Sequence, residues 1–389
     1  MIRQAGSIEH ARFYNNDKTR AAVGAASRQW GGGLLMSRIV WLLAGAVIAG
    51  VISQTAPASA QDGKWRMATP LPSPQGEITS AVIGKKWYVF GGYDAPNVQA
   101  RGIVTVYDAA ADSWTDRKNM LIPAHHAAAV ALDGKIYVFG GFVGRPGTKV
   151  WQPIPSAAMY DPDADSWKEL APMPTARGSA QAVVVDGKIY VIGGAHANIP
   201  GKPMTEPLWV GVPQIVVGTV EVYDPASNTW QTRAPMPTGR NHFLAVAVDG
   251  KIYALNGRLG TPFVTMSDVT DLVEAYDPAT DTWTYKSRSP TRRGDVAGDV
   301  YNGKIYVTGG EYEEPAGKLT FWAFEAYDPK TNSWQVLPHM QIARHGFVAN
   351  FIDNEFHVAG GSFQSDGEPG IFSQMASHEV FAVPKQAGQ

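Results

Sequence analysis

Four arginines occupy the same place relative to a tryptophan, and together they could bind an anion. Each lies ten residues after a tryptophan, and they are Arg177, Arg240, Arg293 and Arg344. Guanidinium groups donate hydrogen bonds in a planar fork that suits carboxylates and phosphates. If a repeated fold brings these positions together beside a channel, the arginines would line an anion-binding funnel. The alternative is structural: each arginine pairs with an acid of a neighbouring repeat or caps backbone carbonyls.

Other polar side chains could complete such a funnel. Arg258 would add a fifth arginine, and Asn241 and His345 directly follow two of the first four. We therefore predict a ligand-binding set of Arg177, Arg240, Arg293, Arg344, Arg258, Asn241 and His345. If the protein is an enzyme, Glu311 or His242 could act as the acid or base.

The histidines do not predict a metal centre. The chain has nine of them, and none follows an HxxxH or similar ligand spacing. His125 and His126 are adjacent, and in a strand their side chains would point to opposite faces. The sequence therefore predicts neither a metal ion nor a cofactor. It also has no cysteine, which excludes disulfides and thiol nucleophiles.

Two motifs that recur along the chain must position these residues. One begins with aspartate and ends with tryptophan, as in Asp161–Trp167, and the other is an apolar strand that ends in two glycines. From each of six tryptophans to the first residue of the next glycine pair is 26 residues, counting Asn256-Gly257 as a degenerate pair. The distance from a pair to the next tryptophan varies from 23 to 37 residues. Six equal spacings indicate an internal repeat of about 50 residues.

From Trp65 onward the sequence resembles the kelch family. The resemblance rests on the glycine pairs, the six tryptophans and the tyrosines Tyr107, Tyr160, Tyr223, Tyr276 and Tyr327. It implies a propeller with four antiparallel strands per blade, in which the glycine pair ends the second strand and the tryptophan opens the fourth. Asp-Gly dipeptides such as Asp186-Gly187 favour type I′ hairpins between the first two strands.

The chain ends predict how the ring closes. The last repeat stops without a tryptophan, whereas Trp65 has no glycine pair before it. A strand at Lys64–Met67 should therefore complete the last blade, which predicts an all-β, six-bladed kelch propeller. The loops of variable length would share one face with the loops between blades, and such loops usually carry binding sites. Trp151, Trp209 and Trp322 lie in these loops and could bind a partner or pack the loops onto the blades.

The N-terminal segment has the pattern of a secretory signal. A 14-residue apolar run, Ile39–Ile52, follows Arg38 and precedes Ala58-Ser59-Ala60. We predict an unassigned extension at 1–35, a signal peptide at 36–60, the propeller at 61–384 and a tail at 385–389. The protein would be periplasmic or secreted, without a stable membrane span after processing; an uncleaved anchor is the alternative.

Two functions remain open at this stage. The formal net charge of −2 disfavours nucleic acid. A binding module could hold a carbohydrate, another anionic small molecule or a protein through the variable-loop face. Alternatively, exported six-bladed kelch proteins include N-acetylneuraminate epimerases, and the resemblance would then imply a periplasmic sugar-acid mutarotase. A copper radical enzyme similar to galactose oxidase would need a cysteine-linked tyrosine, which this chain cannot form.

Overall fold

The computed structural model describes residues 63–94, 99–144, 151–197, 214–260, 268–314, 317–365 and 373–384. These residues belong to one compact unit, Thr55–Gln389. Every regular element among them is a β-strand, and none of them forms a helix that could cross a membrane. The predicted extension, signal peptide and C-terminal tail, and Trp209, lie outside the described residues.

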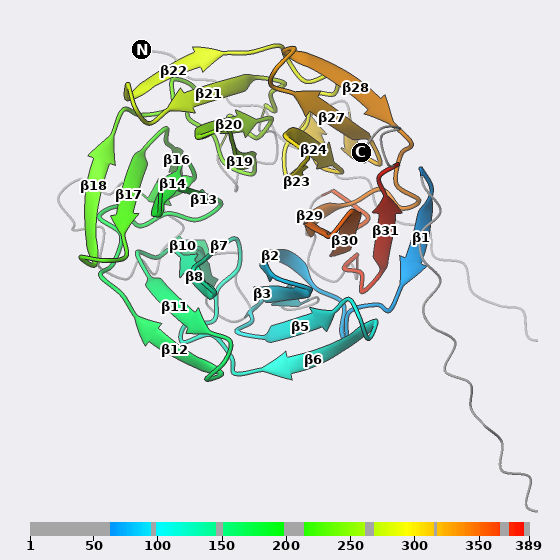
Figure 1. Ribbon diagram of the computed structural model, residues 1–389, viewed down its shortest axis with the longest axis horizontal. Coiled ribbons are helices and arrows are strands. Elements are labelled where there is room, and N and C mark those ends of the chain that lie inside the picture. Colours follow the sequence, from blue (N-terminus) through cyan, green and yellow to red (C-terminus); the bar gives the residue numbers. More distant parts are fainter. Residues whose placement is uncertain are drawn as a thin grey trace, which may run out of the picture. The chain divides into compact units, whose positions relative to one another are not determined.

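Six four-stranded antiparallel sheets are arranged around a central axis (Figure 1). From the innermost strand outward, the first three are β2 (Gly76–Ile83), β3 (Lys86–Asp94), β5 (Val104–Asp108) and β6 (Ser113–Arg117); β7 (Ala128–Leu132), β8 (Lys135–Phe139), β11 (Ala157–Asp161) and β12 (Ser166–Glu169); and β13 (Gln181–Val185), β14 (Lys188–Ile192), β17 (Val220–Asp224) and β18 (Thr229–Arg233). The others are β19 (Leu244–Val248), β20 (Lys251–Leu255), β21 (Val273–Asp277) and β22 (Thr282–Tyr285); β23 (Ala297–Tyr301), β24 (Lys304–Thr308), β27 (Phe324–Asp328) and β28 (Ser333–Leu337); and β29 (His345–Ile352), β30 (Glu355–Ser362), β31 (His378–Ala382) and β1 (Trp65–Ala68). These sheets are called blades 1 to 6 below.

Blade 6 combines both ends of the propeller, as the sequence predicts. Its outermost strand, β1, pairs antiparallel with β31, and Trp65 lies opposite Phe381. The strand at the start of the propeller is thus the fourth strand of the last blade. The third strand of this blade is therefore paired on both sides and leaves no open edge.

The hydrophobic core lies between blades rather than within one. Six clusters of buried apolar side chains each join two neighbouring blades. In the cluster that joins blades 6 and 1, for example, Trp87 and Tyr107 pack with Val348 and Ala359. Each blade therefore buries its apolar faces only when both neighbours are present.

The repeated tryptophans link neighbouring blades. Each indole N–H donates to a backbone carbonyl just after the outermost strand of the preceding blade, and Trp230 donates to Ala171 at 2.8 Å. The other five bonds run from Trp65 to Pro338, from Trp114 to Thr69, from Trp167 to Lys118, from Trp283 to Ala234 and from Trp334 to Ser287. A buried indole needs such a partner, so the motif links every blade to the one before it.

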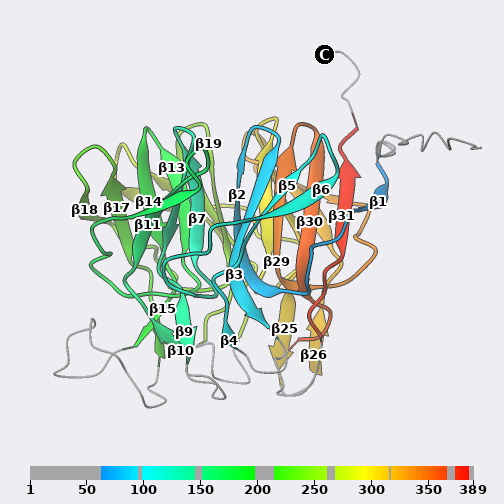
Figure 2. The same ribbon diagram turned by 90° about the horizontal axis from the view of Figure 1, so that it is seen from below.

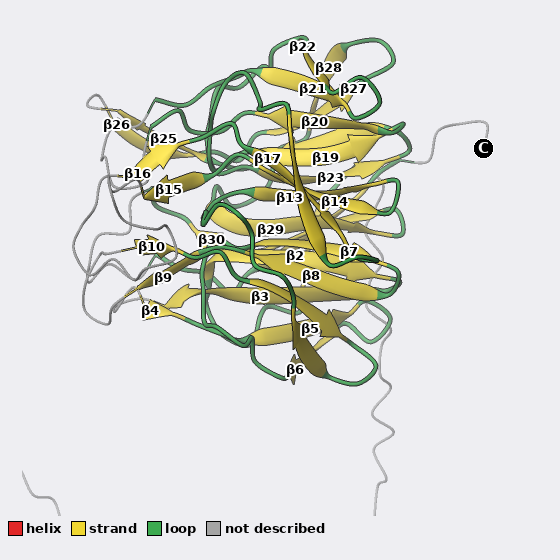
Figure 3. Cartoon of the chain, turned by 90° about the vertical axis from the view of Figure 1, so that its left-hand side faces the viewer, coloured by secondary structure: helices red, strands yellow, loops and turns green. Residues whose placement is uncertain are grey.

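The two faces of the propeller differ. Tight hairpins close one face, the hairpin-turn face, where Asp186 and Gly187 have φ of 50° and 69°, as a type I′ turn requires. The opposite, variable-loop face carries further short strands: β4 (Gln99–Ala100) beside β3, β9 (Phe142–Gly144) with β10 (Trp151–Pro153), β15 (Ala195–Ala197) with β16 (Gln214–Val216), and β25 (Glu311–Glu314) with β26 (Gly317–Thr320). Figures 2 and 3 show these additions on one side only.

Candidate functional site

The four arginines that follow the tryptophans do not line a funnel. Arg177, Arg240, Arg293 and Arg344 are all 0% exposed. Each pairs with a glutamate in the third strand of its own blade: Glu221 at 2.8 Å, Glu274 at 2.5 Å, Glu325 at 3.0 Å and Glu379, respectively. The prediction that they converge on a solvent-accessible funnel is wrong.

Backbone carbonyls accept hydrogen bonds from Arg177, Arg240 and Arg344 inside the blades. Arg177 donates from Nη1 to the carbonyls of Gly193 and Thr219 at 2.8 and 2.9 Å. Arg344 repeats this geometry with Gly360 and Ser377 at 2.9 and 3.2 Å. The guanidinium thus satisfies carbonyls beside the glycine pair, and the glutamate neutralises its charge inside the blade. The structural alternative holds, with the acid supplied by the same blade.

A second repeated position, two residues after the arginine position, faces the axis. One residue comes from each blade, and together they form what we call the axial ring: Glu77, His126, Ser179, His242, Asp295 and Gly346. All six have a positive φ, between 51° and 62°. Non-glycine residues rarely adopt this left-handed conformation. Its presence in every blade shows that the fold imposes it at or just before the start of the innermost strand.

Backbone hydrogen bonds draw the axial ring tightly together. The amide of His126 donates to the carbonyl of Glu77 at 3.0 Å, and the amide of Ser179 donates to His126 at 2.9 Å. The amide of Asp295 donates in the same way to His242 at 2.6 Å. Residues from neighbouring blades are therefore in direct backbone contact at this level, and their side chains meet on the axis.

The carboxylate of Glu77 lies close to histidines of two neighbouring blades. Its Oε2 atom is 2.8 Å from Nε2 of His126, and its Oε1 atom is 3.6 Å from Nδ1 of His345. Gly346 makes room for it, because a Cβ added there would lie 2.8 Å from Oε1 of Glu77. The two histidines thus approach one carboxylate from different blades.

His125 and His126 do not point to opposite faces as predicted. Their Nδ1 atoms lie 2.5 Å apart, because the positive φ of His126 breaks the alternation of a strand. His242 is held by its predecessor: Nδ1 lies 2.5 Å from Oδ1 of Asn241, whose amide nitrogen donates to the Gly260 carbonyl. Burial lowers the pKa values of His125 and His242 well below 6.5, so both are neutral.

Three carboxylates, of which two are buried and one is half-buried, surround His345. Its Nδ1 atom is 2.8 Å from Asp295 and 3.4 Å from Glu311. Burial by itself disfavours the imidazolium, but Glu311, Asp295 and Glu77 outweigh it and raise the pKa of His345 to about 10. Glu311 also pairs with Arg258 and accepts a hydrogen bond from Ser365. Of the predicted site residues, Arg258, Asn241, His242, Glu311 and His345 therefore do gather near the axis, but all are buried.

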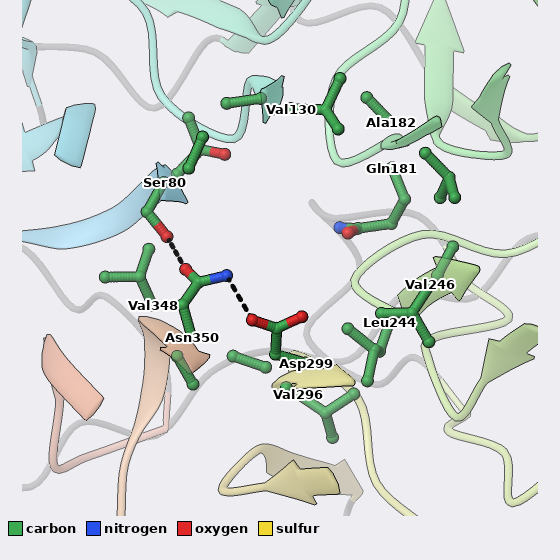
Figure 4. Close-up of a pocket in the computed structure, with 18 of the residues that line it drawn as sticks. Ser80, Val130, Gln181, Ala182, Leu244, Val246, Val296, Asp299, Val348 and Asn350 are labelled. Atoms are coloured by element: carbon green, nitrogen blue, oxygen red, sulfur yellow. Dashed lines mark hydrogen bonds between the residues drawn. The ribbon is translucent and has the colours of Figure 1, made fainter. Parts of the chain in front are cut away.

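A channel of about 410 Å³ leads to the axial ring. It runs along the innermost strands towards the hairpin-turn face, past Ser80, Gln181, Asp299 and Asn350. In Figure 4, Ser80 donates to Asn350 at 2.6 Å, and Asn350 donates to Asp299 at 3.2 Å. Burial raises the pKa of Asp299 above its usual value. Polar groups thus line the channel on the side opposite to the predicted funnel.

The sequence-based site missed Glu77, His126 and Asp299. The signal for the first two was present, because all six ring residues lie twelve positions after a tryptophan. A ligand spacing such as HxxxH places histidines close together in the sequence, whereas the fold collects one residue per blade. The absence of a local ligand spacing is therefore no argument against a metal site in this fold.

Comparisons with known proteins agree with this architecture. Residues 58–194 match the KLHDC2/KLHL20/DRC7 Kelch-repeats domain, and residues 176–237, 239–288 and 292–341 match Kelch motifs. The fold defines a six-bladed β-propeller. The chain belongs to the kelch-repeat β-propeller family.

Curated relatives and a solved structure place the chain within that fold. Kelch-like protein terF of Aspergillus terreus is 30% identical over 77% of this chain and 64% of its own length. Kelch-like protein 23 of Homo sapiens is 30% identical over 68% of this chain and 42% of its own length. The chain thus spans less than two thirds of these relatives. The structure of YjhT superimposes with a TM-score of 0.64 at 18% identity, over 80% of this chain and 96% of that one, which shows the fold alone.

Proposed function

We propose that the propeller is a protein-binding module that uses its variable-loop face. The observation that carries this proposal is where apolar side chains are exposed. Ten large apolar side chains are exposed in the described part of the chain, and the seven on this face are Leu121, Ile122, Ile215, Leu259, Leu319, Trp322 and Phe363. The other three, Met67, Tyr285 and Val336, lie on outermost strands. Exposed apolar side chains that gather on one face favour a protein partner.

Blades 5 and 6 supply the most exposed part of this face. Leu319 is 57% exposed on β26, and Phe363 is 50% exposed just after β30. The hydroxyl of Thr320 donates to the Phe363 carbonyl at 2.9 Å, which joins the two segments. Trp322, 56% exposed, stacks on His339 with ring centroids 5.1 Å apart. Aromatic anchors such as Trp322 carry much of the binding energy in many protein interfaces.

A small anionic ligand on this face has less support. A mutarotase that acts on a sugar acid would need a guanidinium within reach of the substrate carboxylate. Arg177, Arg240, Arg293 and Arg344 are buried in ion pairs, and Arg258 pairs with Glu311. Among the described residues, the arginines predicted to bind the carboxylate are therefore already held in ion pairs with glutamates.

Site-specific photocrosslinking tests the proposal. A photoreactive phenylalanine placed at Leu319 or Phe363 should crosslink one protein in the native host, which mass spectrometry can identify. Placed at Val336, which is 73% exposed on an outermost strand, it should not. The double variant Leu319→Asp/Phe363→Asp should weaken binding of the purified partner at least about tenfold, whereas Val336→Asp should not. Equal crosslinking from Val336, or none from the two face positions, would contradict the proposal.

We also propose that the protein is exported from the cytoplasm. The apolar run Ile39–Ile52 and the following Ala58-Ser59-Ala60 support export with cleavage near Gln61. N-terminal sequencing of the protein recovered from the periplasm or medium should begin near Gln61. Recovery only from the cytoplasm with Met1 or Met36 intact would contradict export.

A further inference from the structure

We propose that the axial ring binds one divalent first-row transition metal ion through Glu77, His126 and His242. One ligand atom from each of these three residues lies within 4.8 Å of the other two. Two imidazoles and one carboxylate form a ligand set that zinc and iron(II) use in proteins. This site is separate from the variable-loop face, so the metal proposal does not depend on the protein-binding proposal.

The hydrogen bonds select the nitrogen that each histidine offers. Nδ1 of His242 lies 2.5 Å from the Asn241 amide oxygen, so it carries the proton. Nδ1 of His126 contacts Nδ1 of His125. Nε2 is then the nitrogen that each ring presents to a metal ion. Orientation of an imidazole through its other nitrogen is typical of metal-ligating histidines.

The contact between Glu77 and His126 supports convergence on a third atom. Oε2 and Nε2 are 2.8 Å apart, yet Nε2 has no partner with hydrogen-bond geometry. Two ligands of one metal ion show this relation, because each points at the metal rather than at the other. Ligand bonds of about 2.0–2.2 Å would place the metal beside both atoms.

The charge of the surroundings favours a cation. Glu77 and Glu311 are buried beside the half-buried Asp295, and Arg258 pairs with Glu311. Three carboxylates against the Arg258 guanidinium and the His345 imidazolium leave one net negative charge that a buried site must compensate. Asp295 and His345 lie on the other side of Glu77, where they form a second convergent set with it. Asp295 can supply a further ligand.

The surroundings also leave the metal open on one side. Trp151 packs over both imidazoles of His125 and His126, with centroids 4.8 and 5.0 Å away. In the other direction, Glu77, His126, His242 and Asp295 all line the channel. A metal ion here would therefore keep a coordination position facing the channel, as in sites that bind water or a small ligand.

Metal binding to the purified, tag-free propeller tests this proposal. Metal-free protein should bind one Co²⁺ or Zn²⁺ per chain in calorimetry, and bound Co²⁺ should show the visible absorption bands of a site with nitrogen ligands. His126→Ala, His242→Ala and Glu77→Gln should each weaken binding by more than about 100-fold, and Asn241→Ala by about 10- to 100-fold. His339→Ala, which removes an exposed histidine, should leave binding unchanged.

Each outcome decides the proposal once folding is verified. Circular dichroism and the unfolding midpoint identify variants that fail to fold, and Glu77→Gln and Asn241→Ala retain most of the packing volume if the alanine variants of the histidines do not. The proposal is overturned if the folded wild type binds neither Co²⁺, Zn²⁺ nor Mn²⁺ saturably. It is equally overturned if binding persists unchanged in folded Glu77→Gln and Asn241→Ala.

Discussion

The arginine of each arginine–glutamate pair lies two residues before a residue of the axial ring. The two positions differ in how their residue types vary from blade to blade. Blades 3 to 6 all have the arginine, and each has a glutamate as the second residue of its third strand. Blades 1 and 2 have Gln75 and Ala124 instead, and there Thr105 and Ala158 replace the glutamate. The pair is thus present or absent as a unit, as expected of a structural element.

The axial ring shows the opposite behaviour. Its backbone conformation is the same in all six blades, whereas its side chains are glutamate, histidine, serine, histidine, aspartate and glycine. Uniform side chains inside each blade stabilise the blade, and varied side chains on a uniform backbone assemble a site that no single repeat contains. In a repeat protein, the position where the residue type varies can therefore be more informative about function than the position where it is constant.

The largest effect should come from breaking an arginine–glutamate pair. Arg240→Met leaves Glu274 buried, with only 1% of its side chain exposed, without its counter-charge. We expect a loss of about 3–5 kcal/mol in the free energy of unfolding, measured with urea. Lys251→Ala is the control, because its pair with Asp277 is solvent-exposed and should leave the midpoint unchanged.

The double variant Arg240→Met/Glu274→Leu sharpens this test. It removes both charges, so most of the lost stability should return. If the single variant is as stable as the wild type, the pair is not the structural element described above.

The next effect concerns acid stability, to which a buried histidine inside blade 6 should contribute. Burial lowers the pKa of His378 on β31 to about 4, and its Nδ1 atom donates to the Thr69 carbonyl at 3.0 Å. The unfolded chain takes up this proton near pH 6.5, so stability is lost as the pH falls from about 6.5 to about 4. This histidine should account for about 3 kcal/mol of that loss.

Urea unfolding at pH 7 and pH 4.5 measures this contribution. In His378→Gln the acid-induced loss should be smaller than in the wild type, while His339→Gln should behave as the wild type does. An equal loss in His378→Gln would assign the acid sensitivity to other groups.

A smaller effect should distinguish the axial ring from ordinary turns. Gly346→Ala requires a positive φ of an alanine and brings Cβ to 2.8 Å from Glu77, whereas Gly303→Ala requires the same φ with nothing within 4 Å. Each should cost about 1–2 kcal/mol in unfolding free energy. Only Gly346→Ala should also weaken Co²⁺ binding, because it displaces the Glu77 carboxylate. Equal Co²⁺ affinity in the two variants would show that Glu77 does not need the space above Gly346.

The smallest effect should come from Ser179. Its hydroxyl lies 3.5 Å from Nε2 of His242, which is a weak contact. Ser179→Ala should change the free energy of unfolding by less than about 0.5 kcal/mol and leave Co²⁺ affinity unchanged. A large fall in affinity would make Ser179 part of the metal site and would redefine which ring positions matter.

The sequence alone determined the blade count, the closing strand and the hairpin turns. These features accompany local interactions whose partners recur at a fixed separation, such as the hydroxyl of Tyr223 donating to Asn228 five residues later, which recurs from Tyr107, Tyr160, Tyr276 and Tyr327. A motif that must make the same local contact in each of five blades keeps its spacing, and spacing is visible in a sequence.

Tertiary structure alone decided the use of each polar residue. Arg240 and Glu274 meet inside one blade, so the arginines that suggested a funnel are buried. Glu77, His126 and His242 meet on the axis although they come from three blades, because the positive φ at the ring turns each chain inward. Burial and convergence depend on how the blades close around the axis, and a linear spacing of residues does not contain that information.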